Sequence, residues 1–178
     1  MVTERFVLIS GCSGGGKSTL LAELHQRGHA VVEEPGRRIV HQEQAGDGAA
    51  LPWVDMVAFA RCAIEMALAD RKAAIATKGW VFFDRGLVDA AAALQHAVGE
   101  PVLEALCRAH PYHRCVFMAP PWPEIYETDP ERQHGLSAAI DEYERLCVAY
   151  ALLGYDVMTL PKVSVKDRAD HILEVLRR

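Results

Sequence analysis

Residues Gly11 to Thr19 read GCSGGGKST, and this stretch decides the fold. It fits the pattern G-x-x-x-x-G-K-[ST], which is typical of a phosphate-binding P-loop. Glycines let the backbone coil so that its N–H groups converge on phosphate oxygens. The lysine of the pattern reaches the β- and γ-phosphates, and the serine hydroxyl ligates Mg²⁺. The predicted nucleotide contacts are therefore Gly11, Ser13, Gly14, Gly15, Gly16, Lys17, Ser18 and Thr19.

The segments on either side of the motif favour the P-loop over a chance glycine-rich turn. Phe6 to Ile9 form a short apolar run of strand character directly before it. Thr19 to Arg27 have leucines on one helical face, and Gly28 marks the end of that helix. Strand, glycine loop and helix is the order that the motif requires.

Composition restricts the class of protein. The chain has 178 residues, of which 51% are apolar and 24% charged, so we expect a single nucleotide-binding domain over residues 1–178. A net charge of −5 argues against general nucleic-acid binding, and no run is long enough to cross a membrane. Five cysteines show neither C-x-x-C nor zinc spacing, which predicts reduced thiols and a cytoplasmic location. The oligomeric state stays open, a homodimer included.

The rest of the chain predicts an α/β fold with a parallel sheet of about five strands. Near-continuous apolar runs suit strands buried on both faces, and right-handed crossovers then give a three-layer α/β/α sandwich. The predicted strands are Phe6–Ile9, Ala30–Val32, Trp80–Phe83, Cys115–Met118 and Tyr155–Leu160. The further predicted helices are Val54–Thr77, with Val57, Ile64, Leu68 and Ile75 inward, then Leu136–Leu153 and Val165–Arg177.

Polar residues follow three of these strands, at the sheet edge where ligands gather in such folds. Asp84 follows four apolar residues, as expected of a Walker B carboxylate that holds Mg²⁺; the other interpretation is a simple turn. Arg85 is a candidate phosphate ligand, and a surface ion pair is its alternative. The predicted metal ligands are Ser18 and Asp84.

Glu33 and Glu34 form an acidic pair after the second strand. One of them is expected to take a proton from a substrate hydroxyl or to ligate metal through water, and the sequence leaves open which one. At least one can instead be solvated or paired with a neighbouring arginine. Arg37 and Arg38 either bind an acidic substrate or pair with these glutamates.

The polar stretch from Glu127 to Gly135 contains Pro130 and lies between a strand and a long helix. We predict a lid that places Arg132 over the transferred phosphoryl group; an ordinary exposed loop is the alternative. No N-K-x-D segment for guanine is present, which favours ATP, and Leu160 to Ser164 are placed to contact its base.

These motifs together resemble a known family. GCSGGGKST, VVEEPGRRIV, FFDRGLVDA, TDPERQHG and LPKVSVKDRADHIL are similar to segments of the small bacterial "predicted ATPase" proteins of the AAA-domain P-loop type. That group is close to the P-loop nucleoside and nucleotide kinases, including the ribosylnicotinamide kinase domain. The resemblance spans nearly the whole chain. It implies a kinase-like core, nucleotide binding at the P-loop, an acid–arginine pair at Asp84 and Arg85 and a lid arginine at Arg132.

The sequence therefore predicts a P-loop enzyme that transfers a phosphoryl group from ATP·Mg²⁺ to a small-molecule hydroxyl or phosphate. Lys17, Asp84, Arg132, Glu33 and Glu34 are its catalytic candidates. A nucleotide-dependent switch or slow ATPase that regulates a protein partner is the first alternative, and a nucleotide-binding module without turnover is the second. The chain is too short for a ring-forming AAA+ machine with a helical lid domain, and the resemblance names no acceptor.

Overall fold

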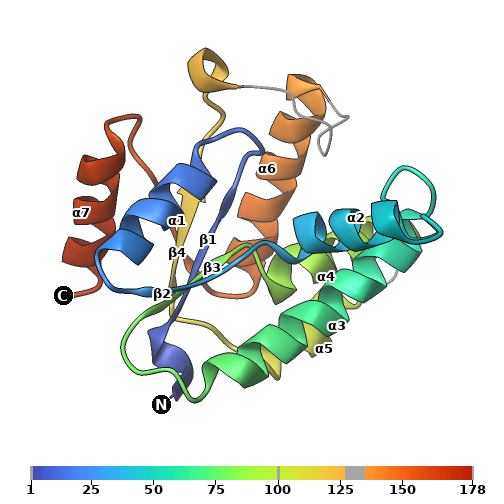
Figure 1. Cartoon of the computed structure of the whole chain (residues 1–178), viewed down its shortest axis with the longest axis horizontal. Coiled ribbons are helices and arrows are strands. Elements are labelled where there is room, and N and C mark those ends of the chain that lie inside the picture. Colours follow the sequence, from blue (N-terminus) through green and yellow to red (C-terminus); the bar gives the residue numbers. More distant parts are fainter. Residues whose placement is uncertain (1, 100, 127–134, 178) are drawn as a thin grey trace.

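The computed structural model describes residues 2–99, 101–126 and 135–177. Five strands form one sheet in the order β2-β3-β1-β4-β5, and every neighbouring pair is parallel (Figure 1). The predicted α/β class with a five-stranded parallel sheet is confirmed. The strands are β1 (Phe6–Gly11), β2 (Ala30–Val32), β3 (Val81–Asp84), β4 (Cys115–Ala119) and β5 (Asp156–Thr159).

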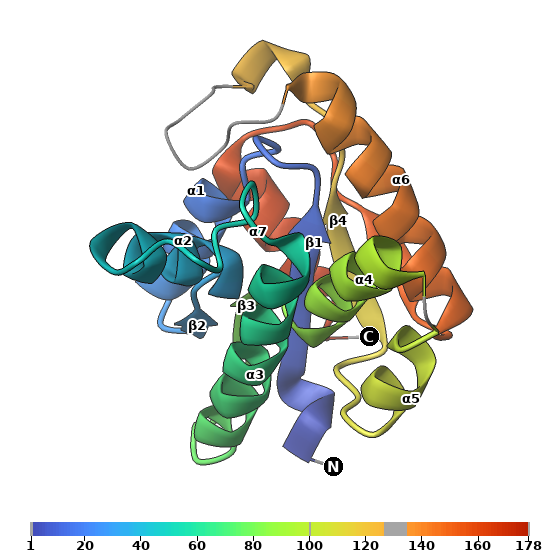
Figure 2. The same ribbon diagram turned by 90° about the vertical axis from the view of Figure 1, so that its right-hand side faces the viewer.

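Helices cover both faces of the sheet, which gives the predicted three layers. Side chains of β1 alternate between two cores: Phe6 and Leu8 pack on one face, Val7 and Ile9 on the other. The second face is closed by α1 (Lys17–Gln26) and α7 (Val165–Val175). Figure 2 shows the helices of the first face, α3 (Met56–Ala74), α4 (Leu87–Val98), α5 (Leu103–Arg108) and α6 (Leu136–Leu152).

The long helix α3 is shorter than predicted, and its predicted inward face is confirmed in part, because Ile64 and Leu68 are partly buried against the core. Asp55 caps its N-terminus by accepting a hydrogen bond from the amide of Ala58. The buried stripe consists mainly of alanines, because α3 packs closely against α4, and the predicted inward Ile75 is 56% exposed beyond the helix end. The buried residues of α3 are Ala60, Ala63, Ala67, Arg71 and Ala74.

Three helices lie where the sequence analysis named no range: α2 (Pro35–Ala45), α4 and α5. Pro35 begins α2 after Glu33 and Glu34, the two residues that follow β2, so Arg37 and Arg38 of the polar cluster lie in the first turns of a helix. Two short 3₁₀ helices, η1 (Val2–Arg5) and η2 (Pro123–Ile125), complete the described elements. No helix among the described residues is long and apolar enough to cross a membrane.

The parallel register brings the functional segments to one edge of the sheet. Ile9 pairs with Asp84 and Gly11 with Ala119, so β1, β3 and β4 end at nearly the same level. The P-loop, the turn after Asp84, the start of α2 and the segment after β4 therefore adjoin each other, as expected for open α/β sheets.

Candidate functional site

The P-loop leaves β1 and is tied to β4. The amide of Cys12 donates to the carbonyl of Ala119 at 2.8 Å, and the amide of Gly15 donates to the carbonyl of Cys12 at 3.1 Å. Gly11 has φ +115°, and a Cβ there would lie 2.3 Å from the Ala119 carbonyl oxygen, so only glycine fits. Gly16 has φ +75° and precedes α1, whose N-terminus faces the loop. These contacts and backbone angles hold the glycine loop between β1 and α1.

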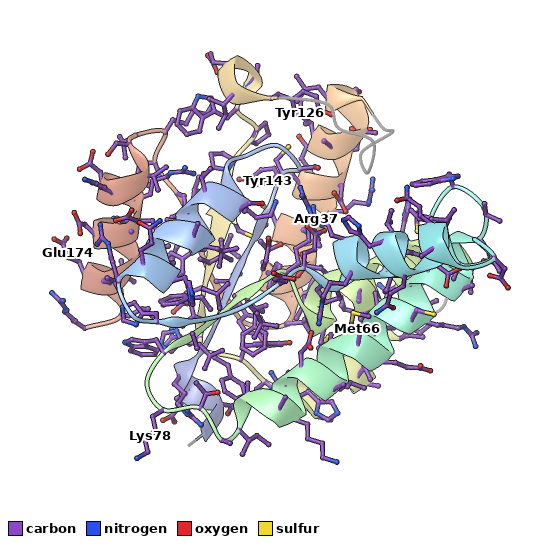
Figure 3. All side chains as sticks on the ribbon, in the orientation of Figure 1. Arg37, Met66, Lys78, Tyr126, Tyr143 and Glu174 are labelled. Atoms are coloured by element: carbon purple, nitrogen blue, oxygen red, sulfur yellow. The ribbon has the colours of Figure 1, made fainter. Side chains whose placement is uncertain are left out.

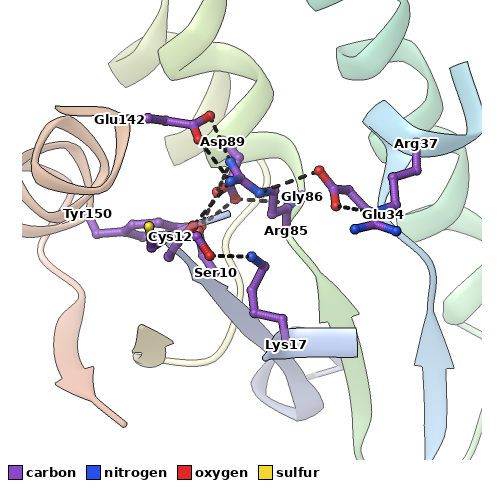
Figure 4. Close-up of polar contacts among 11 residues, drawn as sticks. Ser10, Cys12, Lys17, Glu34, Arg37, Arg85, Gly86, Asp89, Glu142 and Tyr150 are labelled. Carbon is purple, nitrogen blue, oxygen red and sulfur yellow. Dashed lines mark hydrogen bonds and ion pairs between the residues drawn. The ribbon is translucent and has the colours of Figure 1, made fainter. Parts of the chain in front are cut away.

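Lys17 is buried at the base of this loop, only 7% exposed. Its Nζ donates to the Cys12 carbonyl at 3.0 Å (Figure 4). Burial lowers the pKa of Lys17, and the Arg85 charge lowers it further, while Asp84 and Glu34 act in the opposite direction. An anion in the loop would favour the charged ammonium, as expected of a phosphate-binding lysine.

Asp84 and Ser18 lie on the wall of one cavity of about 480 Å³ between α1 and α2, which we call the side cavity. Oδ1 of Asp84 is buried and has no hydrogen-bond partner among the described residues. Burial, with the nearby Glu34 carboxylate, raises the pKa of Asp84 to about 7. A buried carboxylate oxygen without a partner in the described structure, in a cavity that a serine also lines, fits Mg²⁺, because this ion prefers oxygen donors.

The described residues contain no cluster of three or more His, Cys, Asp or Glu side chains able to cage a metal ion. Mg²⁺ does not need such a cage, because it usually keeps several waters and takes other ligands from substrate phosphates. The fit therefore rests on Ser18 and Asp84.

Arg85 is held by carboxylates. The backbone of Arg85 has a positive φ of 57°. Its guanidinium donates two parallel hydrogen bonds to the Glu142 carboxylate, Nη1 to Oε1 at 2.9 Å and Nη2 to Oε2 at 3.0 Å. Its Nε lies 3.5 Å from Oε1 of Glu34 (Figure 4). Its Nη2 donates to the Gly11 carbonyl at 3.1 Å. Burial lowers its pKa, but Glu142, Glu34 and Asp89 outweigh burial and raise the pKa well above its ordinary value. Arg85 thus connects the P-loop to a group of acids.

The two glutamates after β2 differ in position. Glu33 is exposed and borders only the side cavity. The Glu34 carboxylate, half-buried, contacts both Arg85 and Arg37, whose Nε lies 3.4 Å from Oε2. Arg37 points from α2 toward the middle of the site, whereas Lys78 and Glu174 project outward (Figure 3). Arg38 pairs with neither glutamate; its guanidinium binds Asp70 of α3.

Asp89 in the first turn of α4 was missed by the sequence reasoning. It is buried and accepts hydrogen bonds from the Ser10 hydroxyl, from Tyr150 at 2.7 Å and from the amide of Gly86 at 3.1 Å. Burial raises the pKa of Asp89. The group ties β1, α4 and α6 together beneath Arg85. An acid three residues after Gly86 is a capping signal that the sequence did contain.

Arg168 in α7 was missed as well. It is 2% exposed, and its guanidinium donates to the carbonyls of Gly15 at 3.2 Å and Gly16 at 3.4 Å. It also lies over the Trp122 ring, 5.4 Å from the centroid, while its Nε is buried without a partner among the described residues. Burial lowers the pKa of Arg168. Its one signal in the sequence was its place in LPKVSVKDRADHIL, a segment that carries the family resemblance.

Two larger cavities meet at the P-loop. The P-loop cavity, about 500 Å³, runs from residues 13–19 to the segments after β4 and β5, where Trp122, Ile125 and Val163 to Val165 line it. The helix cavity, about 510 Å³, is bounded by α2, α3, α4 and α6. They share a wall, which we call the ionic wall, formed by Ser13, Glu34, Arg37 and Arg85.

The structure thus brings most predicted site residues to one edge, with the P-loop, Asp84, Arg85 and Glu34 adjoining each other. Val163 and Ser164, from the segment expected to contact the base, line the P-loop cavity. Arg132 and residues 127–134 of the expected lid lie outside the described residues. Gly135 precedes the first turn of α6.

Solved structures with similar folds include deoxyadenosine kinase, NadR and shikimate kinase. Deoxyadenosine kinase from M. mycoides, with bound dATP, has a TM-score of 0.68 at 14% identity, covering 97% of this chain and 100% of that one. NadR in complex with NR gives 0.75 at 17% identity, covering 98% of this chain and 51% of NadR. Shikimate kinase from Acinetobacter baumannii gives 0.59 at 16% identity, covering 98% and 94%. At these identities the likeness establishes a P-loop kinase fold.

A comparison with curated protein sequences finds no match. A family model described as "AAA domain" matches residues 6–168, which include the P-loop, the ionic wall and Arg168. The match covers most of the chain and agrees with the kinase-like fold. The protein therefore belongs to this AAA-domain family of small P-loop proteins.

Proposed function

We propose that the protein transfers the γ-phosphoryl group of ATP to a hydroxyl of a small molecule bound in the helix cavity. The observation that carries this proposal is the ionic wall, across which a P-loop cavity adjoins a second cavity of similar volume. A protein that only hydrolyses ATP has no need of a second cavity there. Catalysis of this kind is mainly positioning and electrostatic stabilisation.

Two sets of side chains would hold the nucleotide. The P-loop amides and Lys17 bind the phosphates, and Ser18 and Asp84 would hold Mg²⁺. When bound, the metal ion neutralises charge on the phosphates. Arg168 maintains the loop shape through the carbonyls of Gly15 and Gly16 and adds positive charge behind it.

Glu34 is the residue we assign to the acceptor hydroxyl, because among the two glutamates it alone borders both the P-loop cavity and the helix cavity. The acceptor oxygen forms a bond to the γ-phosphorus while the bond from that phosphorus to the β–γ bridging oxygen breaks. ADP departs with that bond's electrons, and the hydroxyl proton passes to the Glu34 carboxylate. Arg132 is proposed to stabilise the transferred group from the lid.

The matched variants Glu34→Gln and Glu33→Gln test this assignment. General-base catalysis contributes roughly 10²- to 10⁴-fold, so Glu34→Gln should lower acceptor-dependent ADP release by about that factor. Glu33→Gln should remain near wild type, because its side chain borders only the side cavity. ADP release is followed by a coupled assay, and ATP affinity by calorimetry with a non-hydrolysable analogue.

The same assay separates the proposal from its main rival. Slow ADP release that no small-molecule alcohol or phosphate accelerates, with nucleotide-dependent capture of a protein partner, would favour the switch. ADP release that rises with an acceptor, with a phosphorylated product seen by mass spectrometry, would support the kinase.

A further inference from the structure

The helix cavity has polar groups at one end only. Its charged lining gathers at the ionic wall, where Arg85 contacts Glu34, Glu142 and Asp89. The rest of the wall is apolar and comes from α2, α3, α4 and the segment before α3. Its main contributors are Val40, Trp53, Met56, Phe59, Ala63 and Ala93. A ligand that fits this wall has one polar end and a larger apolar body.

Charge at the polar end is the second observation. Two arginines and three carboxylates line the helix cavity: Arg37 and Arg85 against Glu34, Asp89 and Glu142. Arg85 already donates a bidentate fork to Glu142, so its charge is largely neutralised. Even with the buried Asp89 protonated, cations and carboxylates would only be equal in number. An anionic acceptor would meet no excess positive charge from the described residues.

The size of the cavity and its aromatic side chains narrow the class further. About 510 Å³ is typical of a pocket for a drug-sized ligand. Phe59 and Trp53 present aromatic surfaces to the cavity, and alanines of α3 and α4 line it with small apolar side chains. Aromatic walls favour stacking on a planar ring.

We propose that the acceptor is an uncharged or cationic alcohol with an apolar or aromatic ring, and that phosphomonoesters and carboxylates are excluded. This inference rests on the proposed function and selects the hydroxyl over the phosphate as the acceptor group. The hydroxyl lies at the ionic wall beside Glu34, and the ring lies among Phe59, Trp53 and Ala93.

Matched acceptor pairs test the charge rule with the full-length protein and ATP·Mg²⁺. Adenosine is compared with AMP, thiamine with thiamine monophosphate, and shikimate represents an anionic ring alcohol. We expect adenosine or thiamine to accelerate ADP release. The phosphorylated partner should have a kcat/KM at least about 100-fold lower, because its phosphate would meet no excess positive charge from the described residues at the ionic wall.

The outcomes separate this inference from the proposed function. Phosphorylation of AMP, thiamine monophosphate or shikimate with a kcat/KM equal to or above that of the uncharged or cationic compounds would overturn the charge rule and leave the kinase proposal standing. No phosphorylation of any member, in protein that binds the ATP analogue, would overturn both.

A second arm tests the location of the ring. Phe59→Ala should lower acceptor kcat/KM about tenfold while leaving affinity for the ATP analogue unchanged, because Phe59 lines the helix cavity but not the P-loop cavity. Phe59→Leu keeps most of the volume and guards against loss of folding. Leu152→Ala, on the 73% exposed side chain of α6, is the control. Wild-type acceptor kcat/KM in folded Phe59→Ala would contradict the location.

Discussion

The P-loop cavity and the helix cavity are nearly equal in volume, yet their charges differ. Lys17, Arg37, Arg85 and Arg168 line the first, with Glu34 as its one carboxylate among the described residues. Two arginines and three carboxylates line the second. The two share the ionic wall, so the difference arises from what lies on either side of it. This difference is the basis of our proposal that ATP binds in the first cavity and a neutral or cationic acceptor in the second.

The difference has a simple chemical origin. Lys17 and Arg168 donate to backbone carbonyls, which carry no formal charge. Arg85 donates to the Glu142 carboxylate, whose negative charge cancels most of the positive charge of Arg85. Buried cations therefore differ in the attraction they exert on an anionic ligand, because a carboxylate partner neutralises the cation and a backbone carbonyl does not.

Asp84→Asn should have the largest effect on the nucleotide side of this comparison. The change keeps the shape but removes the charge that we assign to Mg²⁺. A metal ion supplies several kcal/mol of charge stabilisation, so kcat should fall about 1000-fold, with ATP affinity reduced far less. Asp156→Asn, at the opposite end of the sheet, is the control. Full activity of Asp84→Asn across a Mg²⁺ titration would reduce Asp84 to a turn residue.

Lys17→Ala removes a cation that lines only the P-loop cavity. A preorganised donor of this kind is worth about 100- to 1000-fold, and kcat/KM for ATP should fall by that factor. Circular dichroism should remain unchanged, and Lys72→Ala, an exposed lysine of α3, should behave as wild type. Unchanged ATP affinity and turnover in the folded variant would refute the P-loop assignment.

Arg168→Gln tests whether a buried arginine without a carboxylate partner in the described structure serves the nucleotide. Removing one such charge should raise the KM for ATP about tenfold and leave kcat within a factor of about three, since electrostatic contributions of this kind amount to about 1–2 kcal/mol. Arg168→Lys keeps the charge and should recover part of the affinity. A drop in kcat with unchanged KM would place Arg168 in the chemical step instead.

Tyr150→Phe should have the smallest effect. It tests how firmly Asp89, which lines the helix cavity, is held in place. The variant removes the hydrogen bond to Asp89 at 2.7 Å but leaves those from Ser10 and Gly86. The free energy of unfolding should fall by about 1 kcal/mol, measured by urea denaturation. A loss of acceptor-dependent turnover well beyond that destabilisation would show that the position of Asp89 governs Arg85.

Much of the nucleotide side could be predicted from the sequence, because its chemistry depends on consecutive residues. The P-loop motif and the strand ending at Asp84 each lie within one short segment. The sheet was predictable for a related reason, since buried parallel strands are short continuous apolar runs.

The helix cavity could not be predicted in the same way. Its walls come from four helices, two of which the sequence analysis did not name. The alanines that line one side of it form no motif that could be recognised in the sequence. Arg168 and Glu142 acquire meaning only when α7 and α6 pack against the P-loop and Arg85. Long-range packing of this kind leaves no local pattern in the chain.

The shared ionic wall has a thermodynamic consequence. Because Arg85 touches the Gly11 carbonyl of the loop on one side and Glu142 on the other, occupancy of one cavity alters the electrostatic field in its neighbour. Such coupling is reciprocal: the factor by which nucleotide changes acceptor affinity must equal the factor by which acceptor changes nucleotide affinity. Under the proposed function, heterotropic cooperativity between nucleotide and acceptor would therefore pass through Arg85, which lines both cavities.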